Sequence, residues 1–280
     1  EAYVDSVQGF EASGIINSSE QFPTLTKAII QELNEKEGEK NISLGYHVIE
    51  FLLWGQDTDP MGPGRRSYTD YVDSDSNPAP ARRGTYLKIA TELLLKALQQ
   101  VAGGWADNGD NYRKKLLSMP ADQALSRILI GIGILSGPEL SGERLTVAYV
   151  TKEQEEEHSC FSDTTHLDMI NNARGIRNIY MGTYRRINGE VVSGKGIHHL
   201  LMEMDSEFAD EMNGWVQASL DLARKIPPPF DQAILGKRTA PGRIAIKALI
   251  NALIKQSTGT ARAAKILNLP IHEQQFDSPI

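Results

Sequence analysis

The chain has 280 residues and a net charge of −7, with 40% hydrophobic and 23% charged residues. These values are ordinary for a globular protein of one large or two modest domains, and the acidic balance argues against a nucleic-acid partner. A lone cysteine, Cys160, excludes an intrachain disulfide and a thiolate zinc cluster. No apolar run approaches the roughly 18–20 residues that a membrane span needs, so no transmembrane helix is expected. We expect the arginine pairs at 65–66, 82–83 and 185–186 on the surface or in buried networks.

Apolar residues recur mostly at three- and four-residue spacing, the period of a helix that buries one face. This spacing predicts helices over residues 25–33, 87–101, 208–222 and 245–253. Strand alternation is scarce, and the one credible hairpin runs from Tyr184 to Val192 around the turn Asn188-Gly189. The pattern therefore predicts an all-α fold of packed helical bundles.

Two breaks organise the chain. The stretch from Gly55 to Pro80 is rich in Gly, Pro, Asp and Ser and is too long for a plain connector. We expect it to lie beside the preceding helix and to help form a ligand cleft, with Arg65 and Tyr68 as contact residues. A second break at Met119-Pro120 divides the chain into an N-terminal helical domain, 1–119, and a C-terminal helical domain, 120–280.

The segment SLGYHVIEFLLW, residues 43–54, is apolar on nearly every face, so a buried helix is expected. Gly45 inside that helix would allow close approach of a neighbour. His47 and Glu50 are three residues apart and share one side. Burying this pair requires hydrogen bonding or a metal, which leaves two interpretations: a structural pair or a functional site. Phe51 occupies the place where a zinc-peptidase helix carries a second histidine.

Residues 153–166, EQEEEHSCFSDTTH, form a second polar cluster, called here the acidic segment. His158, Asp163 and His166 are plausible metal ligands of the nitrogen and oxygen type. Other interpretations stay open: a solvated acidic loop, Ser162 or Asp163 as the cap of the next helix, and Cys160 as inert packing. Because His47 and Glu50 lack partners on their own helix, we expect them to converge with this segment.

A third cluster, GPELSGER at residues 137–144, is expected to begin a helix at Pro138. Glu139 and Glu143 are four residues apart and would project from one face. They are either a metal-bridging carboxylate pair, as in di-iron bundles, or part of a buried ion-pair network with Arg144.

These segments together resemble a known family. GYHVIEFLLWGQD contains the G-x-H-x-x-E signature of the imelysin family, which includes insulin-cleaving metallopeptidases and iron-regulated envelope proteins. GPELSGER, EEEHSCFSDTTH and GIRNIYMGTYRRINGEVVSG (residues 175–194) are similar to further motifs of that family in the same order. The resemblance covers essentially the whole chain.

The resemblance implies two domains, each related to a four-helix bundle, with a site where they meet. His47 and Glu50 carry over as the signature pair, and Glu143, Arg144, His158, Asp163 and His166 as residues of the other polar motifs. It also implies export to the periplasm or outer membrane, with a signal peptide removed or a lipid anchor upstream of Glu1. Family members normally have a further N-terminal helical segment before the position where this sequence starts.

Three functions follow as expectations. The first is a metal-binding protein associated with iron uptake and with envelope iron-uptake proteins, holding iron or zinc through His47, Glu50, His158, Asp163 and His166. The second is a zinc metallopeptidase, with Glu50 or Glu143 as the candidate catalytic carboxylate. The third is a non-enzymatic module for a peptide or polysaccharide, with a cleft lined by Arg65, Tyr68, Glu139, Glu143 and Arg144.

Overall fold

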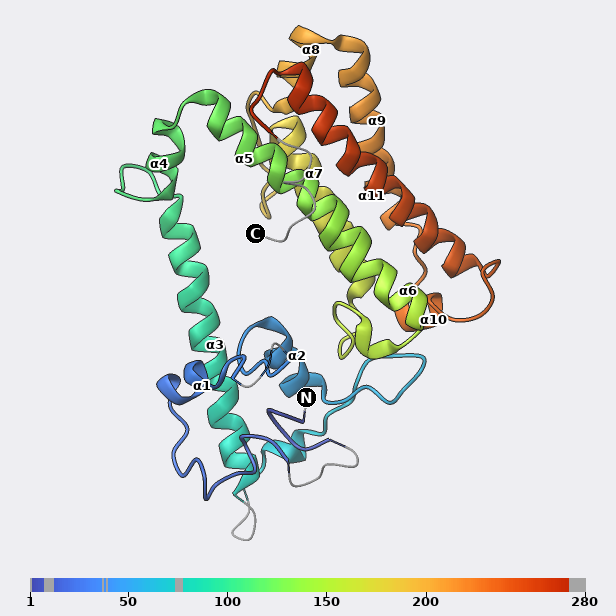
Figure 1. Ribbon diagram of the computed structural model, residues 1–280. Helices are drawn as coiled ribbons and strands as arrows, with labels where there is room; N and C mark the ends of the chain where they lie inside the picture. The colour runs from blue at the N-terminus through green and yellow to red at the C-terminus, as the bar shows by residue number, and fades with distance from the viewer. Residues whose placement is uncertain (1, 8–12, 37, 39, 74–77, 272–280) are drawn as a thin grey trace. The chain divides into compact units, whose positions relative to one another are not determined.

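The computed structural model (Figure 1) describes residues 2–7, 13–36, 38, 40–73 and 78–271. It divides the chain into two compact units, residues 1–115 (unit 1) and 116–280 (unit 2). The predicted all-α fold is confirmed, because the strands of the described residues form one two-stranded sheet and the other regular elements are helices.

Unit 1 is organised around one long helix. Its elements are α1 (Lys27–Leu33), α2 (Tyr46–Trp54), a 3-10 turn (Tyr68–Tyr71), α3 (Ala79–Gly104) and the start of α4 (Tyr112–Ser118). The predicted helix over 87–101 is confirmed as part of α3, but its apolar stripe is only half buried. Tyr86 and Ala90 are fully buried, whereas Leu98 and Val101 toward the end of the helix are exposed.

A buried ionic network ties the start of the chain to α3. Asp5 is completely buried and accepts hydrogen bonds from Arg83 Nε at 2.6 Å and Nη2 at 3.0 Å. Arg66 Nη1 lies 3.1 Å from the same carboxylate and 3.4 Å from Asp70. The expectation that some arginine pairs belong to buried networks is thus confirmed for Arg66 and Arg83, while Arg185 is exposed.

Unit 2 is a four-helix bundle formed by α5–η2, α7, α9 and α11. Its elements are α5 (Ala121–Ile134), η2 (Leu135–Thr146), α6 (Val147–Thr151), a 3-10 turn (Gln154–Glu156), α7 (Thr165–Met181), α8 (Ile197–Met204), α9 (Ser206–Ala223), α10 (Phe230–Ala233) and α11 (Pro241–Ile266). Helix α11 contacts both α5–η2 and α9 (Figure 1). Helix α9 also contacts α7, and α7 contacts η2, which closes the four-helix bundle. The short helix α8 packs against α7 and α9.

Periodicity predicted the buried faces of this bundle well. On α9, Phe208, Met212 and Val216 are buried as expected, and on α11 so is Leu253. The helices approach closely where Gly259 of α11 meets α9, since an added Cβ there would lie 2.6–2.8 Å from the Trp215 ring and the Met212 sulfur.

Pro138 does not begin a helix, and that expectation was wrong. It lies inside a helical run that continues from Ala121 to Thr151. In an α-helix the N–H of residue 138 would bond to the carbonyl of Ile134, and proline has no N–H. The chain instead changes to i→i+5 hydrogen bonding, so η2 is a π-helix, and Val147 N–H bonds to the Gly142 carbonyl.

The helical run from Ala121 to Thr151 also corrects the expectation that no apolar segment of the chain is long enough for a membrane span. Its 31 residues have a window of mean hydropathy 1.2, long and apolar enough to cross a membrane by length and composition alone. A core helix passes the same test, and the buried residues Leu129, Leu140 and Leu145 pack within unit 2.

The predicted hairpin is confirmed. Strands β1 (Thr183–Arg185) and β2 (Val191–Ser193) pair antiparallel, with Tyr184 opposite Val192. Gly189 in the connecting turn has φ +87°, which explains the Asn-Gly sequence there.

Candidate functional site

The signature pair forms as its spacing predicted. His47 and Glu50 project from the same side of α2, and His47 Nδ1 lies 2.8 Å from Glu50 Oε2. The glutamate side chain is 10% exposed and the histidine 47% exposed. A buried carboxylate therefore orients a histidine ring that solvent and ligands can reach.

The helix around this pair is less buried than expected. Val48, Phe51 and Leu52 are buried, but Leu53 is 48% exposed. Helix α2 has nine residues, and it buries only the face that packs against its neighbours, such as α3. Gly45 lies before the helix rather than inside it, with φ +102° and nothing within 4 Å of an added Cβ. Backbone conformation, not close approach, explains this glycine.

The segment after α2 lies beside it, as predicted, although residues 74–77 lie outside the described part. Arg66 N–H donates to the Trp54 carbonyl at 2.7 Å, and Tyr71 Oη donates to the Leu52 carbonyl at 2.5 Å. Arg66 also stacks over the Phe51 ring at 5.1 Å. This segment therefore fixes the end of α2 and, through Arg66, links it to the buried Asp5.

The two predicted contact residues of that segment point to solvent. Tyr68 is 80% exposed, and Arg65 pairs with Asp59 at 2.9 Å on the surface. Their role in ligand contact stays a prediction.

The acidic segment contains a 3-10 turn and a loop that leads into α7, and its last two residues, Thr165 and His166, begin that helix. Glu153, Glu155 and Glu156 are exposed, in keeping with the solvated-loop interpretation, but Glu157 and Asp163 are buried. Cys160 is a buried thiol, which agrees with inert packing.

Asp168, which the sequence analysis did not single out, organises this turn. Its Oδ2 accepts a 2.6 Å hydrogen bond from Ser159 Oγ and lies 3.7 Å from His158 Nδ1. Ser159 N–H also donates to Thr165 Oγ1 at 2.9 Å. Because Asp168 sits in the first turn of α7, ten residues after His158, no local spacing rule pointed to it.

Of the interpretations left open for this segment, the one in which Ser162 or Asp163 caps the next helix is wrong, because neither residue occupies the N-cap position. Thr164 precedes α7 and makes no side-chain cap hydrogen bond. Ser162 Oγ instead bonds to Thr164 Oγ1 at 2.8 Å, and Asp163 has φ +56°. A left-handed aspartate is uncommon and strained positions of this kind gather at functional sites. The Nδ1 atom of His166 is buried and has no hydrogen-bond partner among the described residues.

The third cluster forms an ion pair on the π-helix. Arg144 Nε and Nη2 both lie 2.8 Å from Glu139 Oε1, with side chains 41% and 37% exposed. The pair is therefore partly exposed, and Glu143 is exposed as well. A metal-bridging role for Glu139 and Glu143 stays a prediction.

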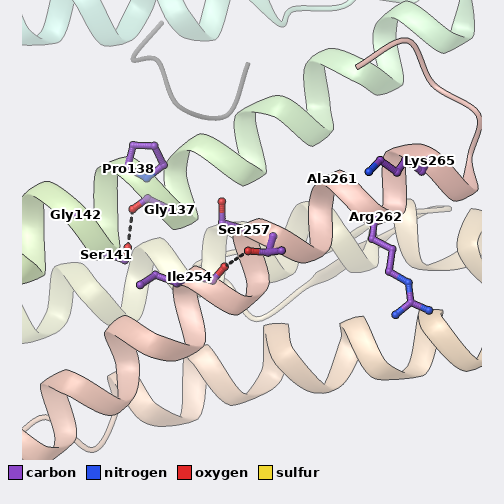
Figure 2. A pocket seen from close by; sticks show the side chains of 10 residues that line it. Gly137, Pro138, Ser141, Gly142, Ile254, Ser257, Ala261, Arg262 and Lys265 are labelled. Atoms are coloured by element: carbon purple, nitrogen blue, oxygen red, sulfur yellow. Dashed lines mark hydrogen bonds between the residues drawn. The ribbon is translucent and has the colours of Figure 1, made fainter. Parts of the chain in front are cut away.

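A pocket of about 810 Å³ lies between η2 and α11. Figure 2 shows Gly137, Pro138 and Ser141 on η2 across from Ile254 and Ser257 on α11, with Arg262 and Lys265 farther along α11. The expected cleft residues Glu139, Glu143 and Arg144 do not line this pocket. Small side chains leave the space open, and its serine hydroxyls already donate to backbone carbonyls of Gly137 and Gly133, each at 2.8 Å.

The described residues fit a metal site only in part. The described residues contain no group of three or more His, Cys, Asp and Glu side chains placed to hold a metal ion. His47 and Glu50 do fit one element of such a site. A ligating histidine commonly bonds through its other ring nitrogen to a carboxylate, which here directs ligation to Nε2.

Comparison with known proteins identifies the family to which this chain belongs. Among solved structures, the chain is similar to a Parabacteroides distasonis ATCC 8503 protein provisionally described as an iron-regulated protein A precursor. The two share 19% identity and a TM-score of 0.64 over 95% of this chain and 74% of that one, so the likeness concerns the fold. No curated protein sequence gives a significant match. The imelysin family model matches residues 2–259, nearly the whole sequence. The chain belongs to the imelysin family.

Proposed function

We propose that this imelysin-family chain binds iron or a related divalent cation through His47, in the cell envelope and in association with iron uptake. The observation that carries the proposal is the 2.8 Å contact between His47 Nδ1 and the buried carboxylate of Glu50. A buried carboxylate keeps the imidazole in one orientation and raises its basicity as a ligand. Imidazole and carboxylate donors suit zinc and iron.

Two further features support this proposal. The structurally similar protein is described as iron-regulated and as a precursor, a term for proteins made with a removable leader. The acidic segment of unit 2 contains His158, Asp163 and His166, which are also side chains of the kind that binds such cations. Their role as ligands stays a prediction.

The test is metal binding by the full chain purified without chelator, titrated with Zn²⁺ and, without oxygen, with Fe²⁺. We expect His47→Ala to weaken binding by about tenfold or more, and Glu50→Gln by about 10- to 100-fold, the usual effect of losing an orienting carboxylate. His199→Ala is the matched control, because His199 is an exposed histidine on α8. Unchanged affinity in His47→Ala together with a lower melting temperature would make the pair structural.

His158→Ala and His166→Ala, measured in the same titration, test the acidic segment: weaker metal binding than in the parent chain would identify it as a source of ligands. An assay on unfolded casein tests the metallopeptidase alternative: metal-dependent hydrolysis that Glu50→Gln abolishes would favour it over binding alone.

A further inference from the structure

The charged side chains that line a second cavity in unit 2 are positive, which disfavours a metal ion and favours an anion. The cavity measures about 600 Å³ and lies between α6 and the first turns of α11. Six residues line it: Tyr149, Arg238, Ile244, Lys247, Ala248 and Asn251. The charged side chains in this lining are both cations, although the chain as a whole carries a net charge of −7.

These two cations are available to a ligand. Arg238 and Lys247 are exposed, and neither forms an ion pair within the part of the chain that the structure describes. The loop that carries Arg238 is held toward α6, because Lys152 Nζ donates to the Gly236 carbonyl at 3.0 Å.

The start of α11 adds to the positive potential. This helix has 26 residues, with Pro241 at its beginning and no acidic residue in its first turn. The unbonded N–H groups and the macrodipole of a helix N-terminus favour an anion. Ile244, which lines the cavity, belongs to that first turn.

A buried arginine behind Tyr149 supplies a further cation. Arg243 is 4% exposed, and its guanidinium lies 3.8 Å from the centroid of the Tyr149 ring. It donates to the carbonyls of Tyr149 at 2.8 Å and Ile234 at 2.5 Å, while its Nε is buried without a hydrogen-bond partner in the described part. No ion pair compensates this charge among those residues. Arg243 does not itself line the cavity, but its charge lies against the Tyr149 ring, which does, and so it adds to the positive potential there.

We propose that this cavity binds a small anionic molecule whose phosphate or carboxylate group is attached to an apolar or aromatic body. Arg238, Lys247 and the α11 N-terminus take the anionic group. Ile244, Ala248 and the Tyr149 ring face the apolar part, and the 56% exposure of Ile244 leaves apolar surface for it to cover. The site is independent of His47.

Titration calorimetry of the full chain at low ionic strength tests the proposal, with phenyl phosphate, benzoate and the neutral benzyl alcohol as probes. We expect at least one anionic probe to bind, and the tighter of the two identifies the preferred head group. Arg238→Gln/Lys247→Gln should weaken its binding about tenfold or more, since hydrogen bonds to charged groups are the strong ones. Lys88→Gln/Lys96→Gln removes the same charge from exposed positions on α3 and should leave affinity unchanged.

A second variant separates binding from folding. Ile244→Glu places a carboxylate in the first turn of α11, where it favours the helix but repels an anion. We expect an unchanged or higher melting temperature and loss of binding. Absence of binding by both anionic probes at millimolar concentration would overturn the proposal. So would equal affinity in Arg238→Gln/Lys247→Gln, or benzyl alcohol binding as tightly as the anions.

Discussion

Replacing Asp5 by Asn is the sharpest test of what holds unit 1 together. The substitution keeps the size of the side chain and removes its charge. Asp5 is fully buried between Arg83 and Arg66, whose side chains are 8% and 7% exposed. Without the carboxylate charge, two buried guanidinium groups lose the counter-ion that they share.

The expected cost is large. Breaking a buried ion pair by removing one partner costs about 3–5 kcal/mol, because the remaining charge stays buried. Domains are stable by only about 5–15 kcal/mol, so Asp5→Asn should remove a substantial part of the free energy of unfolding of unit 1. Asp70→Asn is the control: that carboxylate is 43% exposed and 3.4 Å from Arg66, and its loss should cost under about 1 kcal/mol.

Urea denaturation followed by circular dichroism measures the free energy of unfolding. Hydrogen exchange of peptides from α3 shows whether the loss of stability occurs in unit 1. We expect exchange across α3 to accelerate in Asp5→Asn and to change little in Asp70→Asn. If the two variants unfold within about 1 kcal/mol of each other, the buried network does not stabilise unit 1 as argued.

The free energy of unfolding of unit 1 should depend on pH through the buried carboxyl group of Asp5. Burial alone would raise the pKa of the Asp5 carboxyl, but the hydrogen bonds and charge of Arg83, with the charge of Arg66, hold it below its ordinary value. Asp5 therefore contributes stability above the pKa of an unfolded aspartate, about 3.9. That stability is lost as the pH falls from there through the folded pKa. Acid unfolding of unit 1 should be less steep in Asp5→Asn than in the parent chain.

Two further substitutions test unit 2. Gly259→Ala should destabilise it by up to about 2 kcal/mol, because overpacking against the Trp215 ring costs about 1–3 kcal/mol and alanine regains only about 1 kcal/mol of helix propensity. An added Cβ at Gly214 on α9 would have nothing within 4 Å, so Gly214→Ala should instead stabilise unit 2 by up to about 1 kcal/mol. Equal melting temperatures of the Gly259→Ala and Gly214→Ala variants would contradict the packing argument. Arg144→Gln should change the free energy of unfolding by less than about 1 kcal/mol, since its pair with Glu139 is partly exposed; a larger loss in chemical denaturation would place the pair in a more buried setting.

The fold could be predicted from local periodicity because the apolar residues of a buried helical face recur every three or four positions. The faces of α9 and α11, the hairpin at Asn188-Gly189 and the His47–Glu50 contact all depend on neighbours within one or two turns. The network around Asp5 could not be predicted in this way. Asp5 and Arg83 are 78 residues apart, and only the fold brings a residue of the first segment against a long helix.

The π-helix shows why even a local motif was misread. Proline inside a helix usually signals a break, because it lacks the N–H for the i−4 carbonyl. Here the helix changes register, and the change alters which residues share a face. In an α-helix, residues five apart point roughly 140° from each other, too far for an ion pair. Glu139 and Arg144 are five apart and meet at 2.8 Å, and Thr146 Oγ1 likewise reaches the Ser141 carbonyl five residues back. Because π-helical turns are rare and often lie at functional sites, the register of this helix supports the prediction that the GPELSGER stretch has a functional role, and that role stays a prediction.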